Sequence, residues 1–196
     1  MALATGILAA MNHFDLTNHF LIAMPTLADP NFSRTVTYIC AHNEEGAMGI
    51  VVNRPIDIEL GEVLAQMDLA ADDPAVSARP VYQGGPVHTD RGFVLHRPAR
   101  EWSSTITVTA EVGISTSRDI LEAISAGTGP ADSLVALGYA GWGAGQLEQE
   151  MADNAWLSGP ADLAIVFETP SELRWQRAAA LIGIDLTAMS HDVGHA

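Results

Sequence analysis

The first third of the chain alternates compact apolar runs with turn-forming residues. Residues 19–24 form an apolar run that Pro25 closes, and residues 34–42 follow with β-branched and aromatic side chains in a half-alternating order. Both patterns are typical of strands. A turn at residues 43–46 leads to another apolar run at residues 47–53, so the last two runs are predicted to pair as an antiparallel hairpin.

Helical periodicity appears after this hairpin. Leu60, Val63, Leu64 and Met67 recur at spacings that place one apolar stripe on a short helix. A further helix is predicted over residues 146–151. Two others are predicted to begin at residues 116–119 and 169–172, the latter with a threonine, a proline and a glutamate arranged as a capping box. Strands are predicted at residues 80–86 (ending in a tight turn), 92–96, 105–108, 112–114, 133–139 and 163–167. This irregular mixture, without repeats or linkers, predicts one α+β (mixed α/β) domain.

The composition and net charge of the chain exclude or disfavour several kinds of chemistry. The 196 residues carry 24 acidic and 9 basic side chains, a formal charge of −15, and every basic side chain is arginine. The absence of lysine excludes a Walker-type phosphate loop and a lysine Schiff base. The single cysteine, Cys40, excludes an internal disulfide and multi-cysteine metal sites. Because nucleic-acid affinity depends on neutralising phosphates, the acidic balance also disfavours direct nucleic-acid binding.

No targeting signal is predicted in the N-terminal segment. Residues 2–11 are apolar, but no basic residue precedes them and no run reaches the roughly 20 apolar residues that span a bilayer. Residues 1–17 are therefore expected to form a mobile extension or a short helix, without membrane association. With one thiol and no export signal, the expected compartment is the reducing cytoplasm.

Three local patterns have a functional and a purely structural interpretation. The glycines of residues 138–145 follow a predicted strand and could cradle an anion, or could simply let the backbone turn sharply. Cys40 and His42 should leave the same strand face, which permits an activated thiolate but equally a buried cysteine. His191 and His195 have the spacing of a helical metal pair, but a frayed tail is the favoured interpretation, and no metal site is predicted.

The candidate ligand pocket consists of donor-rich residues near the ends of predicted strands. If these ends meet, their side chains would suit a carboxylate or phosphate on a small ligand. The candidates are Arg34, Asn53, Arg54, Gly84, Gly85, His88 and Arg91. The competing interpretation is that the arginines pair with acidic side chains nearby.

One modest basic patch is also predicted. Arg91, Arg97 and Arg100 fall close together with His88 and His96, and Asp90 opposes them. This patch is the basis of a nucleic-acid hypothesis, for which affinity should fall steeply with salt. A solvated loop is the alternative interpretation.

Several of these segments, taken in order, resemble the AlgH/YqgE family of bacterial proteins from about Asn18 to the end of the chain. The matching blocks are residues 21–25, 29–30, 34–36, 42–43, 46–49, 53–55, 84–87, 91–96, 138–147, 154, 156 and 194–196. Ala41 departs from the pattern, because relatives often carry glutamate there, which weakens an acid/base role for His42. The extra length before Asn18 also departs from it, so residues 18–196 are taken as the AlgH/YqgE-like domain.

The resemblance implies a single domain on a strongly bent mixed sheet, partly closed like a barrel, with helices packed outside. Family members are named as candidate transcriptional regulators, and the resemblance supplies no catalytic residues or cofactor. The leading hypothesis is therefore a non-enzymatic binding or regulatory protein that acts on an unidentified protein or small molecule, without a cofactor. The alternative is an enzyme or small-ligand-binding protein with its pocket at Arg34, Asn53, Arg54 and His88.

Overall fold

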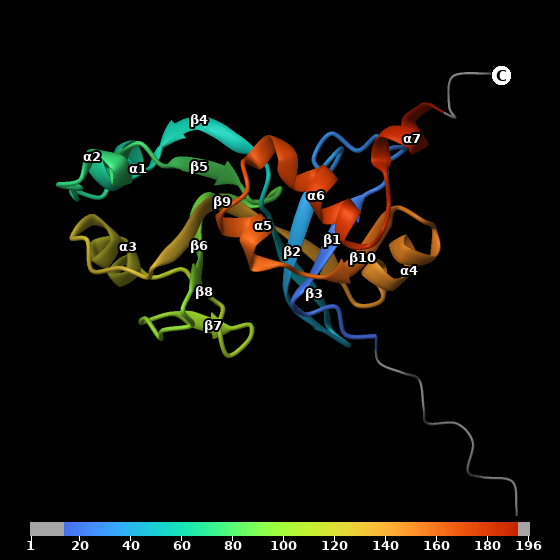
Figure 1. The fold of residues 1–196 in the computed structure, drawn as a ribbon. Coiled ribbons are helices and arrows are strands. Elements are labelled where there is room, and N and C mark those ends of the chain that lie inside the picture. Colours follow the sequence, from blue (N-terminus) through green and yellow to red (C-terminus); the bar gives the residue numbers. More distant parts are fainter. Residues whose placement is uncertain (1–13, 192–196) are drawn as a thin grey trace, which may run out of the picture.

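In the computed structural model, which describes residues 14–191, ten strands form one curled sheet that closes into a half-barrel (Figure 1). Its order is β10-β1-β2-β3-β9-β6-β8-β7, and β4 joins through β5 to β9. Of these pairings only β5 with β9 is parallel, so the sheet is mixed. The strands are β1 His19–Ala23, β2 Val36–Asn43, β3 Gly46–Val51, β4 Pro55–Glu59, β5 Pro80–Gln83, β6 Val87–Arg97, β7 Thr105–Thr107, β8 Gly113–Ser115, β9 Asp132–Gly143 and β10 Trp156–Pro160.

Helices cover both faces of this sheet, which confirms the predicted mixed α/β single domain. The elements are α1 Leu60–Gln66, α2 Pro74–Ser77, α3 Arg118–Ser125, α4 Gln146–Ala152, α5 Leu163–Phe167, the 3₁₀ turn η1 Ser171–Leu173, α6 Arg174–Leu181 and α7 Leu186–His191. The short helices α1, α2 and α3 lie together at one end of the molecule, and α4 and α7 lie at the other (Figure 1). No helix in residues 14–191 combines the length and apolar character that a bilayer crossing requires.

Alternation along the strands divides the apolar side chains among three clusters. Phe20 and Ile22 of β1 belong to the largest cluster, which also contains buried residues of α5, α6 and α7. Leu21 points the other way, into a cluster with Trp142 and α4. Val94 of β6 belongs to a third cluster, formed with α1, α2 and α3. Side chains that follow one another along a strand thus enter different clusters, because a strand has a period of two.

Strand β9 connects the two halves of the sheet. Its first part pairs with β5 and β6, and its last part pairs with β3. Gly138 separates these parts with φ of 74°, a left-handed conformation that glycine adopts without steric cost. The glycine-rich segment predicted as a strand-to-helix turn is therefore mostly strand with one sharp bend, since β9 continues to Gly143. This placement corrects the sequence-based boundary at Tyr139.

The prediction of a strand at residues 163–167 is wrong, because this segment is α5. The side chain of Asp162 accepts a hydrogen bond from the Ala164 amide at 2.9 Å and caps the helix. The last strand is instead β10, Trp156–Pro160, which pairs with β1. The capping box at residues 169–172 does not form, because the Thr169 hydroxyl donates to the Ala164 carbonyl at the end of α5.

The start of the described chain is part of the fold. Leu16 is buried in the same cluster as Trp142, and its amide donates to Nδ1 of His42 at 3.0 Å. The packed unit thus includes Leu16, which lies before the expected boundary at residue 18. The expectation for residues 1–13 lies outside the described residues.

Candidate functional site

The candidate site begins at an interruption in β6. Pairing with β9 is irregular between Val87 and Gly92, so the residues between them leave the regular ladder. His88 has φ of 48°, in the left-handed region that side chains other than glycine seldom adopt. Such bulges and strained residues cluster at binding sites because they aim side chains away from the sheet. Here the irregularity exposes His88 and Arg91.

Gly84 and Gly85 support this interruption through their backbones. The Gly84 amide donates to the Leu137 carbonyl, and its own carbonyl accepts from the Val51 amide, both at 2.8 Å. A Cβ on Gly84 would lie 2.3 Å from the Gly138 carbonyl oxygen. A Cβ on Gly85 would lie 2.1 Å from the backbone carbonyl carbon of Tyr139, the next residue of β9. The two glycines are therefore needed for close packing of backbones.

Beside the interruption lies an open cavity of about 720 Å³. Its apolar lining includes Met48, Phe93 and Ile114, which extend the largest core cluster to the surface. His88 and Arg91 contribute the basic groups of the lining, and it also includes Glu45, Ser104 and Thr116. This volume lies within the range of small-molecule sites, which are mostly apolar with few polar groups.

The basic side chains are held against aromatic rings. The His88 and Tyr139 ring centroids are 5.9 Å apart, and the Arg91 guanidinium carbon is 5.8 Å from the Phe93 ring centroid. Nη2 of Arg91 donates to the Thr116 hydroxyl at 3.3 Å. The remaining guanidinium donors and the imidazole can bind a carboxylate while its apolar body contacts the rings.

The other predicted pocket residues serve a different part of the molecule. Arg54 donates to three backbone carbonyls of the loop between β1 and β2, those of Pro30 at 2.8 Å, Asn31 at 2.6 Å and Ser33 at 2.9 Å. Burial lowers the pKa of Arg54 from its ordinary value. The cavity lining that contains His88 and Arg91 does not include Arg54.

Asn53 and Arg34 stabilise the same loop. Asn53 accepts from the Val36 amide at 2.9 Å and donates to the Arg34 carbonyl at 2.9 Å. The Arg34 guanidinium lies 5.0 Å from the Trp175 ring centroid on α6, and neither Asn53 nor Arg34 lines the cavity. The structure thus brings His88 and Arg91 together and places Arg34, Asn53 and Arg54 elsewhere.

Cys40 and His42 do not share a strand face, contrary to the sequence prediction. The β2–β3 pairing shifts between Ile39 and Ala41, and this bulge reverses the alternation. Cys40 is 2% exposed in the largest core cluster, and burial raises the pKa of its thiol well above the ordinary range. His42 instead contacts Glu148 of α4, with Nε2 2.8 Å from the carboxylate oxygen. A carboxylate therefore does lie beside His42, although Ala41 supplies none.

A buried histidine–serine pair joins His96, which the sequence analysis placed in the basic patch, to Ser115, which it did not single out. His96 Nε2 is 2.8 Å from the Ser115 hydroxyl, which is also 2.8 Å from the Thr105 hydroxyl, and His96 Nδ1 is 3.0 Å from the Pro98 carbonyl oxygen. His96 and Ser115 are both fully buried, and burial lowers the pKa of His96. Because no exposed face leads to this serine, a substrate cannot reach it. Only the pairing of β6 with β8 reveals it.

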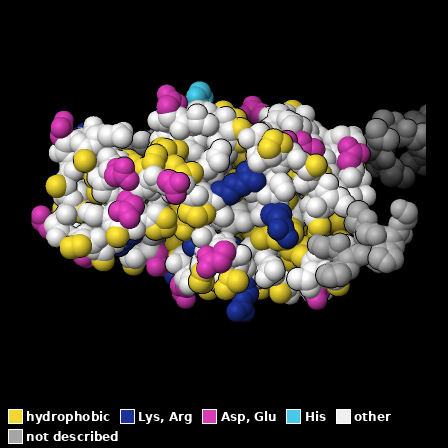
Figure 2. Space-filling model, turned by 90° about the horizontal axis from the view of Figure 1, so that it is seen from above, with side chains coloured by type: hydrophobic (Ala, Val, Ile, Leu, Met, Phe, Trp, Pro, Cys, Tyr) yellow, Lys and Arg dark blue, Asp and Glu magenta, His cyan; other side chains and the backbone are white. Residues whose placement is uncertain are grey.

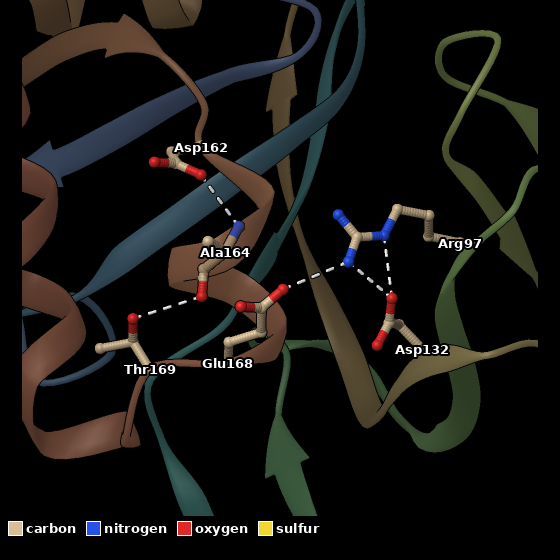
Figure 3. A network of polar contacts seen from close by, with 6 residues as sticks. All are labelled: Arg97, Asp132, Asp162, Ala164, Glu168 and Thr169. Carbon is tan, nitrogen blue, oxygen red and sulfur yellow. Dashed lines mark hydrogen bonds and ion pairs between the residues drawn. The ribbon is translucent and has the colours of Figure 1, made fainter.

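The predicted basic patch is partly neutralised. Arg97 donates two hydrogen bonds to Asp132, at 2.9 and 2.7 Å, and contacts Glu168, the residue that follows α5, at 3.4 Å (Figure 3). Arg100 lies 4.6 Å from the Trp102 ring centroid. Figure 2 shows acidic side chains spread over the upper face, with a few arginines near its middle.

The described residues offer no preassembled metal centre. Within residues 14–191, no group of three or more histidine, cysteine, aspartate or glutamate side chains has a metal-binding arrangement. The spacing of His191 and His195 cannot be tested, because His195 lies outside the described residues. The glycines of residues 138–145, considered above as an anion cradle, are placed differently: those up to Gly143 belong to strand β9, and of this group only Gly145 caps a helix, α4.

A half-barrel sheet with a cavity at the break in β6 defines a mixed α/β protein of one domain. The sequence profile of the AlgH-like family, DUF179, matches residues 20–187. A UPF0301 protein of Thioalkalivibrio sulfidiphilus is 62% identical over 182 residues, covering 93% of this chain and 97% of the relative. Another from Nitrosococcus oceani is 57% identical and covers 91% and 96%. The chain belongs to the AlgH-like UPF0301 family.

Solved structures agree with this assignment. The solution structure of the AlgH protein from Pseudomonas aeruginosa superposes with a TM-score of 0.77, at 50% identity and with complete coverage of both chains. A crystal structure of protein DIP2367 from Corynebacterium diphtheriae gives a TM-score of 0.70 at 18% identity, covering 89% and 91% of the two chains. At 18% identity, the second match shows a shared fold and carries no statement about function.

Proposed function

We propose that this protein is a non-enzymatic binding protein with a regulatory role, and that it holds a small amphipathic anion in the cavity beside His88 and Arg91. The observation that carries the proposal is the combination in one cavity of a guanidinium, an imidazole and aromatic rings. A carboxylate would contact Arg91, and an apolar body would cover Phe93 and Tyr139. The net charge of −15 repels anions, so the contacts in the cavity must outweigh this repulsion. A ligand with a single negative charge and a large apolar part meets this condition best.

The thiol and the histidine-paired hydroxyl most suited to catalysis are both buried, which favours a binding role over an enzymatic one. The Cys40 thiol is buried and its pKa is raised, so the thiolate that a nucleophile requires is disfavoured. Ser115, the hydroxyl beside His96, is fully buried. Arg91 and His88 can position a charge. The lining hydroxyls of Ser104 and Thr116 hydrogen-bond each other, and Thr116 also accepts from Arg91, a cation that cannot serve as a general base.

Regulation would act through a protein partner or the bound ligand, with DNA affected only indirectly. An acidic protein lacks the broad basic surface with which DNA-binding domains neutralise phosphates. A reduced, buried Cys40 fits the cytoplasm, which we propose as the compartment.

The proposal can be tested by ligand-observed NMR with a panel of aromatic and aliphatic monocarboxylates. Binding should weaken about tenfold or more in Arg91→Gln, because a charge-assisted hydrogen bond is lost. Arg100→Gln removes the same charge from an exposed position outside the cavity and should bind like the wild type. Equal affinity in the Arg91 variant would contradict the proposed site, and turnover of a bound carboxylate would contradict the non-enzymatic role.

A further inference from the structure

A second cavity, of about 370 Å³, lies where the start of β5 and the first residues of β9 meet α5 and α6. Its lining includes Arg79 before β5, Ser133 on β9, Phe167 of α5 and Arg174 of α6. The lining of the first cavity contains none of these residues. Two guanidinium groups from separate segments of the chain thus border one cavity.

Arg174 is a buried cation without an acidic partner. It is 6% exposed, and no carboxylate of the described residues lies within ion-pair distance of it. Its guanidinium donates to the backbone carbonyls of Thr169 and Val52 and lies 5.2 Å from the Tyr82 ring centroid. Burying a charge is costly unless an opposite charge compensates it, and burial accordingly lowers the pKa of Arg174. The two carbonyls, the Tyr82 side chain and the charge of Glu172 stabilise the cation, but the effect of burial on its pKa outweighs them.

The other polar groups of the cavity also favour an anion. Arg79 is exposed at the rim, and its Nη1 lies 3.4 Å from the Ser133 hydroxyl. Of the described residues in the lining, Asp132 alone is acidic, and one of its oxygens already accepts two hydrogen bonds from Arg97 (Figure 3). Glu172, whose charge acts on Arg174 from a distance, is exposed to solvent on η1.

We infer that this cavity binds the phosphate group of a small phosphorylated molecule, with the buried Arg174, the exposed Arg79 and the Ser133 hydroxyl beside Arg79 as its donors. A phosphate matches these donors because its charge approaches −2 at neutral pH and its oxygens point in several directions. A planar carboxylate presents one fork and would satisfy one guanidinium. The apolar Phe167 and Leu60 can contact the rest of the molecule.

The test uses inorganic phosphate as the probe, titrated into the whole protein at constant ionic strength and followed by calorimetry. Saturable binding is expected, and Arg79→Gln should weaken it about tenfold or more through loss of a charge-assisted contact. Arg79 is exposed, so this variant should fold normally, whereas replacing Arg174 also removes contacts that anchor α6. Acetate at the same ionic strength should not displace phosphate.

Two variants serve as controls. Arg177→Gln removes the same charge from the exposed side of α6 and should bind phosphate like the wild type. Arg91→Gln alters the first cavity and should also leave phosphate binding unchanged, so failure of one site does not imply failure of the other. The inference is overturned if the wild type shows no saturable binding, if Arg79→Gln binds as well as the wild type, or if acetate displaces phosphate.

Discussion

Replacing Glu150 should destabilise the protein because one carboxylate satisfies two buried tryptophans. Oε2 of Glu150 accepts from the indole nitrogens of Trp142 and Trp156, each at 2.9 Å, and Oε1 accepts from Gln146 at 3.0 Å. The two tryptophans are 6% and 4% exposed. Glu150→Ala leaves both indole donors without a partner, which costs about 1–3 kcal/mol for each buried group.

Glu150 itself is only half-buried, so water can reach part of this site and the lower half of the range applies. We expect the free energy of unfolding to fall by about 3 kcal/mol in Glu150→Ala. For a chain of this size, that corresponds to a Tm lowered by about 6–12 °C. Glu150→Gln keeps an acceptor oxygen but loses its charge, so its cost should be about 1 kcal/mol.

Urea unfolding followed by tryptophan fluorescence measures these differences, with the slope against urea expected to stay constant. Glu122→Ala is the matched control, since Glu122 only pairs with Arg118 on the surface and should cost about 0.5 kcal/mol or less. A Glu150→Ala loss no larger than the control, or a Glu150→Gln loss equal to that of alanine, would refute the reasoning.

Three further measurements test other parts of the structure. His88→Gly should be more stable than His88→Ala by about 1 kcal/mol in thermal unfolding, because the two differ chiefly by a Cβ at a left-handed position; equal stabilities would contradict the strain. Since the pKa of His96 is lowered in the fold, the unfolded state takes up the proton first, and stability should fall as the pH drops below about 6.5. That fall should be shallower in His96→Gln, as unfolding at several pH values would show. Arg54→Ala should destabilise the protein by about 2 kcal/mol and speed proteolysis at residues 29–34, because three carbonyls lose a charged donor; unchanged cleavage would contradict this role.

Sequence patterns predicted much of the sheet because its strands carry local signals. The runs at residues 19–24, 34–42 and 47–53 became β1, β2 and β3, and the stripe at Leu60 became α1. Residues 163–167 misled the prediction because a short apolar run fits a strand or a buried helix equally well. Asp162, whose side chain caps α5, was the local signal that distinguished the two.

The candidate site was less predictable because its geometry depends on irregular pairing between distant strands. His88 and Arg91 share a cavity only because β6 leaves the ladder beside β9. The bulge that separates Cys40 from His42 likewise has no periodic signal. Donor-rich residues could be identified from their chemistry, but which of them meet depended on strand register.

The order of synthesis conflicts with the order of strands. Residues 132–143 supply the strand that joins β3 to β6, and β10 supplies the partner of β1, so the earlier strands leave the ribosome without their central neighbour. Contacts between distant segments form slowly, and unpaired edges left open during that interval invite association with other chains. We therefore expect nascent chains that stop before residue 132 to need chaperone protection, and the sheet to close only after β9 has emerged.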